Sequence, residues 1–427
     1  MTNELEQARQ LLDAGDLPGT VRALRPLAET APLRDLAEMV RRLSEAAGFD
    51  DLADAARGLA KKPENPQALY DFGYACVERG VAFLAVPALR QALRHAPESG
   101  ALRVELVSAL EREHRHAEAV TLLVEHEAEL RDWPERYLLA FNSLLAGDLS
   151  RAREAAARLP APDDTRWEWA RDRVLSMLRR AELAATAGPL DHRDLRGWHY
   201  ALTGGYLGTL SPYGFESGMT GRYAYVQDSV EQCRAGLDRL ASALAVTGSK
   251  PRTVSLLPGR AHHILGLAAA DVLGLPAEPY APGRTDTVVV AYDLSAVDAL
   301  DDETALALRE RADGQVLYEH ATCWTEPPAV NADMSALLCQ LVIEPWGPKL
   351  RVGERGTEEL PADTRPEVEI AAEIVRADTA PDPGDGQTPP DPDEAFAAFV
   401  AATAAGWLTG TRARVDSPGP VGSSRFD

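Results

Sequence analysis

The first part of the chain repeats a helical pattern about every 34 residues, and this constrains the fold more than any other feature. The clearest copy, residues 65–97, carries small or apolar residues at helical spacing and ends on a proline: Leu69, Phe72, Gly73, Cys76, Ala85, Leu89, Ala92 and Pro97. The next copy repeats the pattern at Leu106, Leu110, Ala119 and Leu123, and a third at Tyr137, Ala140 and Leu144. Each copy reads as a pair of helices. One pair cannot bury its apolar face alone, so neighbouring pairs must stack.

This pattern resembles the tetratricopeptide repeat, in which two helices per repeat pack through small residues. Ala85 and Ala92 take the positions where the helices approach most closely, and Pro97 ends the second helix. The resemblance predicts about five helix pairs in residues 1–162. We expect a capping helix to complete an α-solenoid over residues 1–187.

In the tetratricopeptide family the first helices line a concave surface that binds a protein or peptide partner. In the best repeat the resemblance assigns this surface to Gln67, Tyr70, Tyr74, Val77 and Glu78. We expect Tyr70 and Tyr74 to be the anchors, because aromatic side chains contribute much of the binding energy at interfaces. The clamp that chaperone-binding members use for a terminal carboxylate is not expected, because Leu138 stands where the family has a lysine.

Charge and composition limit the partners and the compartment. Acidic residues outnumber basic ones by 66 to 44, giving a net charge of −22. This charge repels a phosphate backbone, so we expect no nucleic-acid partner. The most apolar stretches, residues 264–275 and 395–408, are too short to cross a bilayer, so we expect no membrane association. The first residues lack the features of a signal peptide, and we expect a cytoplasmic protein.

After Gly188 the helical pattern gives way to alternating strands and helices. Residues 253–257 form a short apolar segment with β-branched residues, residues 264–273 read as a buried helix, and residues 287–292 are almost wholly apolar. A strand of the last kind is typical of a parallel sheet buried on both faces. The sequence therefore predicts an α/β domain with a mostly parallel sheet over residues 188–378.

The stretch from residue 252 to 297 resembles the core of a type I phosphoribosyltransferase. The resemblance implies a phosphate-binding turn at Gly259 and Arg260 and a ribose-binding carboxylate at Asp293. The sequence departs from the family after Asp293, where the second acid and the Thr/Gly loop are missing. Three interpretations remain open: an unrelated α/β sheet, a related fold without catalysis, and an active transferase.

A cluster of arginine and aromatic residues precedes the expected helix at residues 230–245. Arg222 and Tyr223 begin this cluster, and they combine a charged hydrogen-bond donor with a stacking surface. Such a pair suits a planar or anionic ligand, including a small phosphorylated one. Aromatic packing between the loop and the helix is the alternative.

Metal-ligating residues occur only in pairs. The pairs His262-His263 and His320 with Cys323 each lack further ligands, and the four cysteines form no CxxC motif, so we expect no metal and no cofactor. A Cys/His nucleophilic pair would need spatial contact and an orienting group. We assign no catalytic residue.

Two segments complete the chain. Residues 379–393 read as a Pro/Asp-rich linker, and residues 394–427 as a short C-terminal helix with a flexible tail. The whole sequence predicts an interaction scaffold that binds a partner through its helical repeats and has a non-catalytic, ligand-binding α/β domain. The alternative is an enzyme acting on a phosphorylated sugar or nucleotide.

Overall fold

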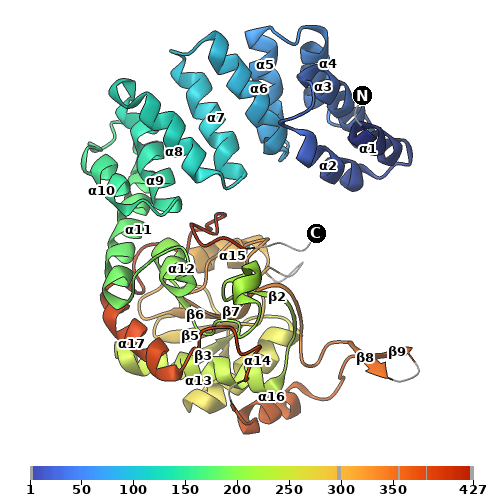
Figure 1. Cartoon of the computed structure of the whole chain (residues 1–427). Coiled ribbons are helices and arrows are strands. Elements are labelled where there is room, and N and C mark those ends of the chain that lie inside the picture. Colours follow the sequence, from blue (N-terminus) through green and yellow to red (C-terminus); the bar gives the residue numbers. More distant parts are fainter. Residues whose placement is uncertain (1–2, 296–299, 354–355, 381, 424–427) are drawn as a thin grey trace. The chain divides into compact units, whose positions relative to one another are not determined.

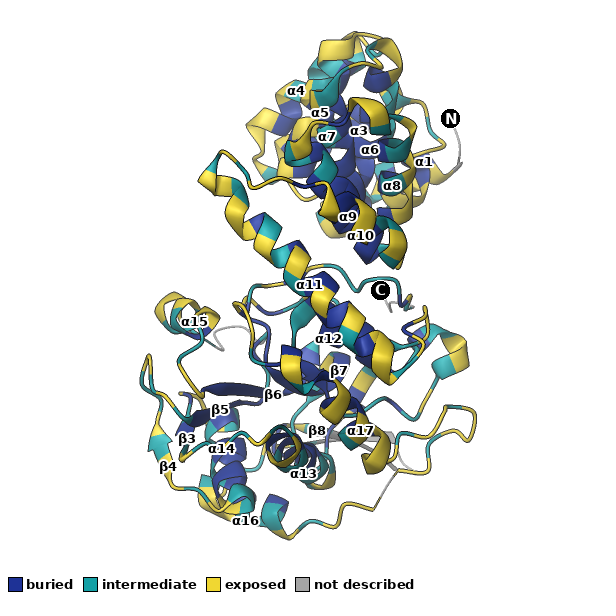
Figure 2. Ribbon diagram, turned by 90° about the vertical axis from the view of Figure 1, so that its left-hand side faces the viewer, coloured by how far each residue is buried: buried dark blue, intermediate teal, exposed yellow. Residues whose placement is uncertain are grey.

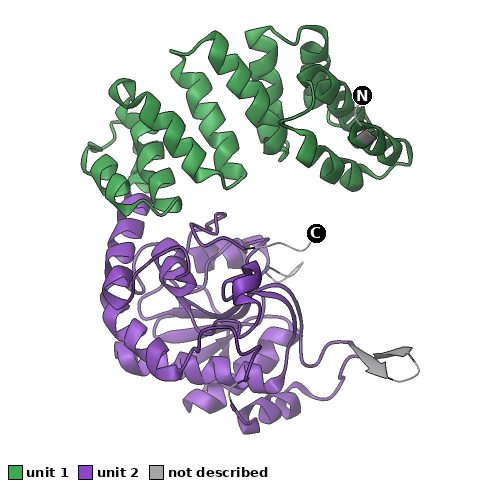
Figure 3. Cartoon of the chain, viewed as in Figure 1, with its two compact units in different colours: residues 1–171 green, residues 172–427 purple. Residues whose placement is uncertain are grey.

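The computed structural model describes residues 3–295, 300–353, 356–380 and 382–423 (Figure 1). The last residues of the expected tail (424–427), residue 381 of the expected linker and residues 296–297 of the transferase-like stretch therefore lie outside the described residues. The chain divides into two compact units, Met1–Arg171 and Asp172–Asp427 (Figure 3). The division falls inside one helix, α11 (Glu168–Ala187), whereas the sequence pattern placed the end of the helical part at residue 187.

The first unit is helical. Its helices are α1 (Asn3–Asp13), α2 (Leu17–Leu24), α3 (Leu33–Ala47), α4 (Asp50–Lys61), α5 (Pro66–Glu78), α6 (Ala82–His95), α7 (Gly100–Arg112), α8 (His116–Glu125), α9 (Tyr137–Leu145) and α10 (Leu149–Ala157). Consecutive helices pack against each other, as α3 does with α4 and α5 with α6, and each pair also contacts the next. The helical N-terminal part is thus confirmed, while the tetratricopeptide assignment stays a prediction.

The clearest repeat forms α5 and α6. Asn65 caps α5 by accepting a hydrogen bond from the Ala68 N–H at 3.0 Å. Phe72 and Ala85 are fully buried between the helices. A Cβ atom on Gly73 would lie only 2.5 Å from the Leu89 side chain, so the glycine is what lets α5 and α6 approach so closely.

The second unit contains a parallel sheet. Its strands are β1 (Tyr206–Leu207), β2 (Tyr223–Gln227), β3 (Thr253–Leu256), β4 (Ala277–Pro279), β5 (Thr287–Ala291), β6 (Val316–Cys323) and β7 (Met334–Ile343), in the order β1-β7-β6-β5-β3-β4. Both β1 and β2 pair with β7, β1 at Met334 and β2 from Cys339 onward, so they form one interrupted edge. Every pairing in this sheet is parallel, which confirms the predicted sheet type.

Helices cover both faces of the sheet (Figure 2). On one face lie α13 (Val230–Thr247) and α14 (Arg260–Leu273), with α16 (Glu367–Arg376) packed on both and α17 (Asp393–Thr403) on α13. The other face carries α12 (Leu195–Thr203) and α15 (Asp302–Arg309). All of β5 is buried, as the apolar run predicted.

Both units also contain shorter elements, namely a hairpin and several short helical turns. A separate antiparallel hairpin consists of β8 (Lys349–Gly353) and β9 (Gly356–Leu360). Short helical turns are η1 (Arg25–Leu27), η2 (Glu127–Glu129), η3 (Asp132–Arg136), η4 (Thr165–Trp167), η5 (Phe215–Met219) and η6 (Ala404–Gly406). In the described part of the chain, no helix has both the length and the apolar character that a bilayer span requires.

The C-terminal segment packs closely onto the second unit. Arg412 and Val421 are buried, and the Trp407 indole N–H donates to the Asp333 carbonyl at 2.8 Å. Asp391, in the segment expected to be a linker, forms ion pairs with Arg196 and Arg239. Where the sequence composition suggested a linker and a flexible tail, buried charges and apolar side chains thus hold the described residues in place.

Candidate functional site

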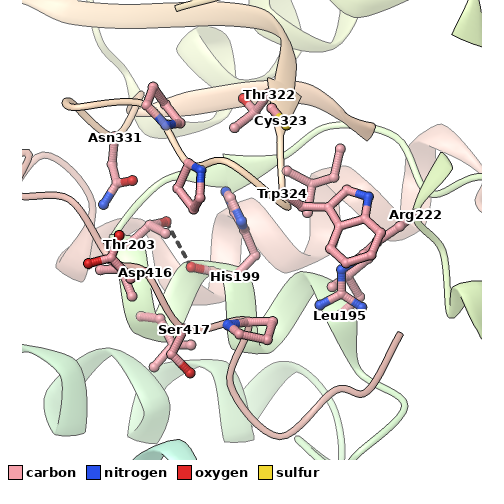
Figure 4. Close-up of a pocket in the computed structure, with 16 residues that line it drawn as sticks. Leu195, His199, Thr203, Arg222, Thr322, Cys323, Trp324, Asn331, Asp416 and Ser417 are labelled. Carbon is pink, nitrogen blue, oxygen red and sulfur yellow. Dashed lines mark hydrogen bonds between the residues drawn. The ribbon is translucent and has the colours of Figure 1, made fainter. Parts of the chain in front are cut away.

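A pocket forms where the chain crosses from β6 to the parallel strand β7. Residues 324–333 make this crossover without a helix, although such connections usually contain one. The crossover leaves a pocket of about 70 Å³ between itself, α12 and the C-terminal segment around residue 416 (Figure 4). Since a water molecule needs about 10–15 Å³ of such space, the pocket has room for several waters or a small anion.

Arg222 is the most unusual residue of this pocket. Arg222 is 2% exposed, yet its Nε and Nη1 have no hydrogen-bond partner among the described residues. The guanidinium lies over the Trp324 ring, 5.4 Å from its centroid. Burial lowers the pKa of Arg222 to about 10, so the group is still charged at pH 7. A buried charge without a partner is costly, so this guanidinium is the part of the pocket whose chemistry most favours an anion.

His199 adds a second unpartnered polar atom. It lies on α12, and Figure 4 shows its ring in the middle of the pocket, with Trp324 and Arg222 together at one side. Its Nε2 atom is buried without a hydrogen-bond partner. Burial, reinforced by the charge of Arg222, lowers the pKa of His199 to about 4. The ring is therefore neutral at pH 7, and Arg222 is the charge that an incoming anion would meet.

Other polar residues around the pocket already have partners. The Thr203 hydroxyl donates to the His199 carbonyl at 2.8 Å, and the Asn331 amide donates to the Ala413 carbonyl at 2.5 Å. The Asp416 carboxylate forms an ion pair with Arg414, which compensates its negative charge. The pocket thus offers one cation and one neutral ring nitrogen to a ligand.

Cys323 lines the pocket at the end of β6 without a neighbouring base. Its Sγ donates to the Gln340 carbonyl at 3.4 Å and accepts from the Glu326 N–H at 3.3 Å. Activation of a cysteine nucleophile requires a base within hydrogen-bond reach. The Cys323 Sγ also lies 3.4 Å from the Thr325 hydroxyl, and none of these contacts, among the described residues, is to a base.

The structure separates the ligand-binding residues that the sequence suggested. Arg222 lines the pocket, and Tyr223 lines a second groove beside β2. Gly259 starts α14 with φ +105°, and Arg260 donates to the carbonyls of Asp363 and Arg365, which fastens the segment before α16.

Asp293 has a local role in the structure. Its Oδ1 accepts hydrogen bonds from the Ser295 N–H at 2.8 Å and the Ser295 hydroxyl at 2.5 Å, which closes its own turn. Neither Asp293 nor the turn at Gly259 lines the pocket with Arg222. The predicted set of five ligand-binding residues therefore does not form one site around this pocket.

His320 faces the opposite layer from Cys323 and joins a buried polar network. Its Nε2 lies 3.0 Å from Asp228 Oδ2, which also accepts the Tyr292 hydroxyl at 2.7 Å and the Cys233 thiol at 3.3 Å. Asp228, Cys233 and His320 lie close enough to hold a metal ion. Without a metal ion, burial and the charge of Asp228 raise the pKa of the Cys233 thiol, and hydrogen bonds connect these side chains.

The predicted partner-binding residues lie on α5. Gln67 and Glu78 are exposed, Tyr74 is 46% exposed and Tyr70 is half-buried. The two tyrosine rings stack with centroids 6.2 Å apart. Val77, in contrast, is buried in the helical unit and offers no surface to a partner.

The comparisons with known proteins add nothing to these observations: no protein-family model matches the chain, and no curated protein is detectably similar to it. The site must therefore be judged from its own chemistry. Sequence reasoning found Arg222 through its aromatic neighbours but missed His199 and Trp324. His199 lies in a run without a recognisable motif, and Trp324 gains its role only because the crossover folds it onto Arg222.

Proposed function

We propose that this protein is a non-catalytic interaction protein with two binding surfaces. One is a tetratricopeptide-type face on the helical unit that binds a protein or peptide partner. The other is the pocket around Arg222, which binds a small anion such as a phosphate or a carboxylate. The observation that carries the second surface is the buried guanidinium whose Nε and Nη1 have no partner.

The chemistry of the pocket supports an anionic ligand. A carboxylate or phosphate oxygen would give Arg222 charge-assisted hydrogen bonds and would accept a third from His199 in its Nε2–H form. The small volume favours a compact anionic group over a whole nucleotide. The transferase alternative has no comparable support, because Asp293 and Arg260 are engaged in local structural contacts.

Anion binding can be measured by titrating the full chain with inorganic phosphate, and separately with acetate, in a calorimeter. We expect Arg222→Met to weaken binding at least tenfold, because hydrogen bonds to a charged group contribute about 1.5–3 kcal/mol each. Arg193→Met is the matched control, since Arg193 lies on the surface of the same unit over Phe215. Equal affinity of the wild type and Arg222→Met would remove the basis of this proposal.

Electrostatics on the helical unit favour a partner with basic or aromatic groups. Glu105 on α7 is partly buried, and its burial together with the charge of Glu78 raises the pKa of its carboxyl. Burial and, after it, the charge of Glu105 raise the pKa of the Tyr70 hydroxyl. The acidic groups therefore lie near the stacked tyrosines. An acidic surface with two aromatic rings suits cation–π contacts with lysine or arginine.

The helical surface is tested with a partner first recovered by pull-down with the full chain and then purified. Tyr70→Ala combined with Tyr74→Ala should weaken its binding by tenfold or more, while the helical content stays unchanged. Phe49→Ala is the control, because it removes another exposed ring of the same unit. If the double variant binds as the wild type does, the partner uses another surface.

A further inference from the structure

A second, larger groove lies beside the edge strand β2, apart from the Arg222 pocket. Its volume is about 1000 Å³. Residues 223–227 of β2 and the start of α13 form one wall, and residues 209–213 with the described part of segment 379–394 form the other. A groove of this size accommodates several residues of an extended chain, whereas the Arg222 pocket holds only a small group.

The backbone of β2 is open on the side away from β7. Within the described residues, β2 pairs only with β7, in parallel from Tyr223 to Gln227. The Asp228 N–H donates to the Ile343 carbonyl at 3.0 Å, and alternate residues of a strand face the same neighbour. The N–H and C=O groups of Tyr225 therefore point away from β7. An exposed strand edge of this kind is a template for a further strand.

Large side chains beside this edge are unusually exposed. Tyr225 is 54% exposed, and its register partner Leu341 on β7 is 56% exposed. Tyr213, on the opposite wall of the groove, is 45% exposed. Surface-exposed pairs such as Tyr225 and Leu341 are the type of apolar patch that partners cover.

Acidic side chains outnumber basic ones in the lining of the groove. Among its described lining residues are six acidic ones, Glu231, Asp238, Asp382, Asp391, Asp393 and Glu394, against one basic residue, Arg239. Three of these acids are in ion pairs: Asp391 with Arg196 and Arg239, Asp393 with Arg239, and Asp238 with Arg234. Glu231 and Glu394 are exposed and form no ion pair within the described residues. The electrostatic field of the groove therefore favours a cationic occupant.

We propose that this groove binds an extended, basic peptide segment of a partner protein, which adds to the sheet as a strand beside β2. Backbone hydrogen bonds to Tyr225 would give the segment its strand register. Its arginine or lysine side chains would lie over the rings of Tyr225 and Tyr213 and against Glu231 and Glu394. This surface is independent of the anion pocket and of the helical unit, since it uses none of their residues.

The test uses the full chain and a fluorescent octapeptide of alternating arginine and valine, with a glutamate and valine octapeptide as the opposite-charge probe. Binding is followed by fluorescence anisotropy at low and at moderate salt. We expect the basic peptide to bind and the acidic one not to bind. Affinity should fall as salt rises, because salt screens exposed charges.

Two variants at Tyr225 separate the contribution of its backbone N–H to peptide binding from the contribution of its aromatic ring. Tyr225→Val keeps the outward N–H and removes the ring, and Tyr225→Pro removes the N–H as well. Proline is tolerated at an edge position whose N–H faces solvent, so the pairing with β7 should survive. We expect Tyr225→Pro to bind at least tenfold more weakly than Tyr225→Val. Equal affinities of the two variants would exclude strand addition.

Charge is tested with Glu231→Gln combined with Glu394→Gln, which should weaken the basic peptide about threefold to tenfold. The control is Glu303→Gln combined with Glu310→Gln, which removes two exposed acidic residues at and after α15, outside the groove. The proposal is overturned if neither peptide binds, if both bind equally, or if both double variants weaken binding alike. Self-association of the chain that is lost in Tyr225→Pro would assign the edge to a second copy instead.

Discussion

Two arginines in the sheet unit are equally buried but differ in how many of their nitrogen atoms have hydrogen-bond partners. Arg412 is 1% exposed and makes hydrogen bonds to Asp333, to the Leu308 carbonyl and to both the side chain and the carbonyl of Gln315. Arg222 is equally buried, but Nε and Nη1 have no partner. Burial alone therefore does not show whether an arginine stabilises the fold or binds a ligand. An arginine whose hydrogen bonds are all made within the fold stabilises it, and the unpaired guanidinium of Arg222 is the basis of the anion site proposed above.

The charge balance around the two arginines shows the same contrast. Burial opposes the ionisation of Asp333, but the charges of Arg412 and Arg311 outweigh this effect and lower the pKa of its carboxyl. No described carboxylate forms an ion pair with Arg222, and burial lowers the pKa of Arg222 to about 10. In the first cluster a carboxylate lies between two guanidinium groups, whereas the anion pocket proposed around Arg222 has no carboxylate paired with that arginine among the described residues.

The largest effect on stability is expected for Arg412→Met. The substitution leaves the Asp333 carboxylate buried with only Arg311 to pair with it, and breaking such a buried pair costs about 3–5 kcal/mol of unfolding free energy. Urea unfolding of the full chain measures this loss. Arg414→Met, at the surface of the same segment, should change stability by less than about 1 kcal/mol. A small effect of Arg412→Met would remove the contrast between the two arginines.

Glu319 is an intermediate case, because it is fully buried with hydrogen-bond donors but without a cation. The Leu294 N–H donates to its Oε1 at 2.7 Å, yet burial raises the pKa of Glu319 to about 8. In the unfolded chain the carboxyl has its ordinary pKa of about 4.3. The contribution of the protonated Glu319 side chain to the unfolding free energy is therefore fully present below about pH 4. It is lost as the pH rises toward 8, because the folded state holds this proton more tightly than the unfolded chain does.

This pH dependence predicts the behaviour of Glu319→Gln, which keeps the shape and cannot ionise. Between pH 5 and pH 8.5 the wild type should lose up to about 4 kcal/mol more unfolding free energy than the variant, at about 1.4 kcal/mol per pKa unit. Urea unfolding at the two pH values gives the difference. Parallel pH profiles for the two proteins would mean that Glu319 is ionised at neutral pH in the fold.

The smallest effect on stability is expected for Arg222→Met. Because its Nε and Nη1 groups make no hydrogen bonds to the described residues, exchanging the guanidinium for an apolar side chain should leave the unfolding free energy within about 1 kcal/mol or raise it. Phosphate should raise the melting temperature of the wild type but not of this variant. A loss comparable to that of Arg412→Met would show that Arg222 is a structural residue.

The sequence by itself determined the elements with strong local patterns. Phe72 and Gly73 on α5 and Ala85 on α6 are buried where the two helices meet, because helical spacing puts each of them on the apolar face of its own helix. The apolar run of β5 likewise predicted a buried strand of a parallel sheet. These predictions depend on residues close together in the chain, where geometry leaves few alternatives.

Only the tertiary structure decided which polar groups find partners. Asp333 and Arg412 pair across 79 residues of sequence, and Asp228 meets His320 across 92. The sequence singled out Arg222 as a ligand-binding residue, but not its missing partner or its place beside His199. Gly259 and Asp293, chosen from a local resemblance, form turns instead of lining the pocket. Hydrogen-bond partners are set by how the crossover and the C-terminal segment pack on the sheet, and no local pattern encodes that packing.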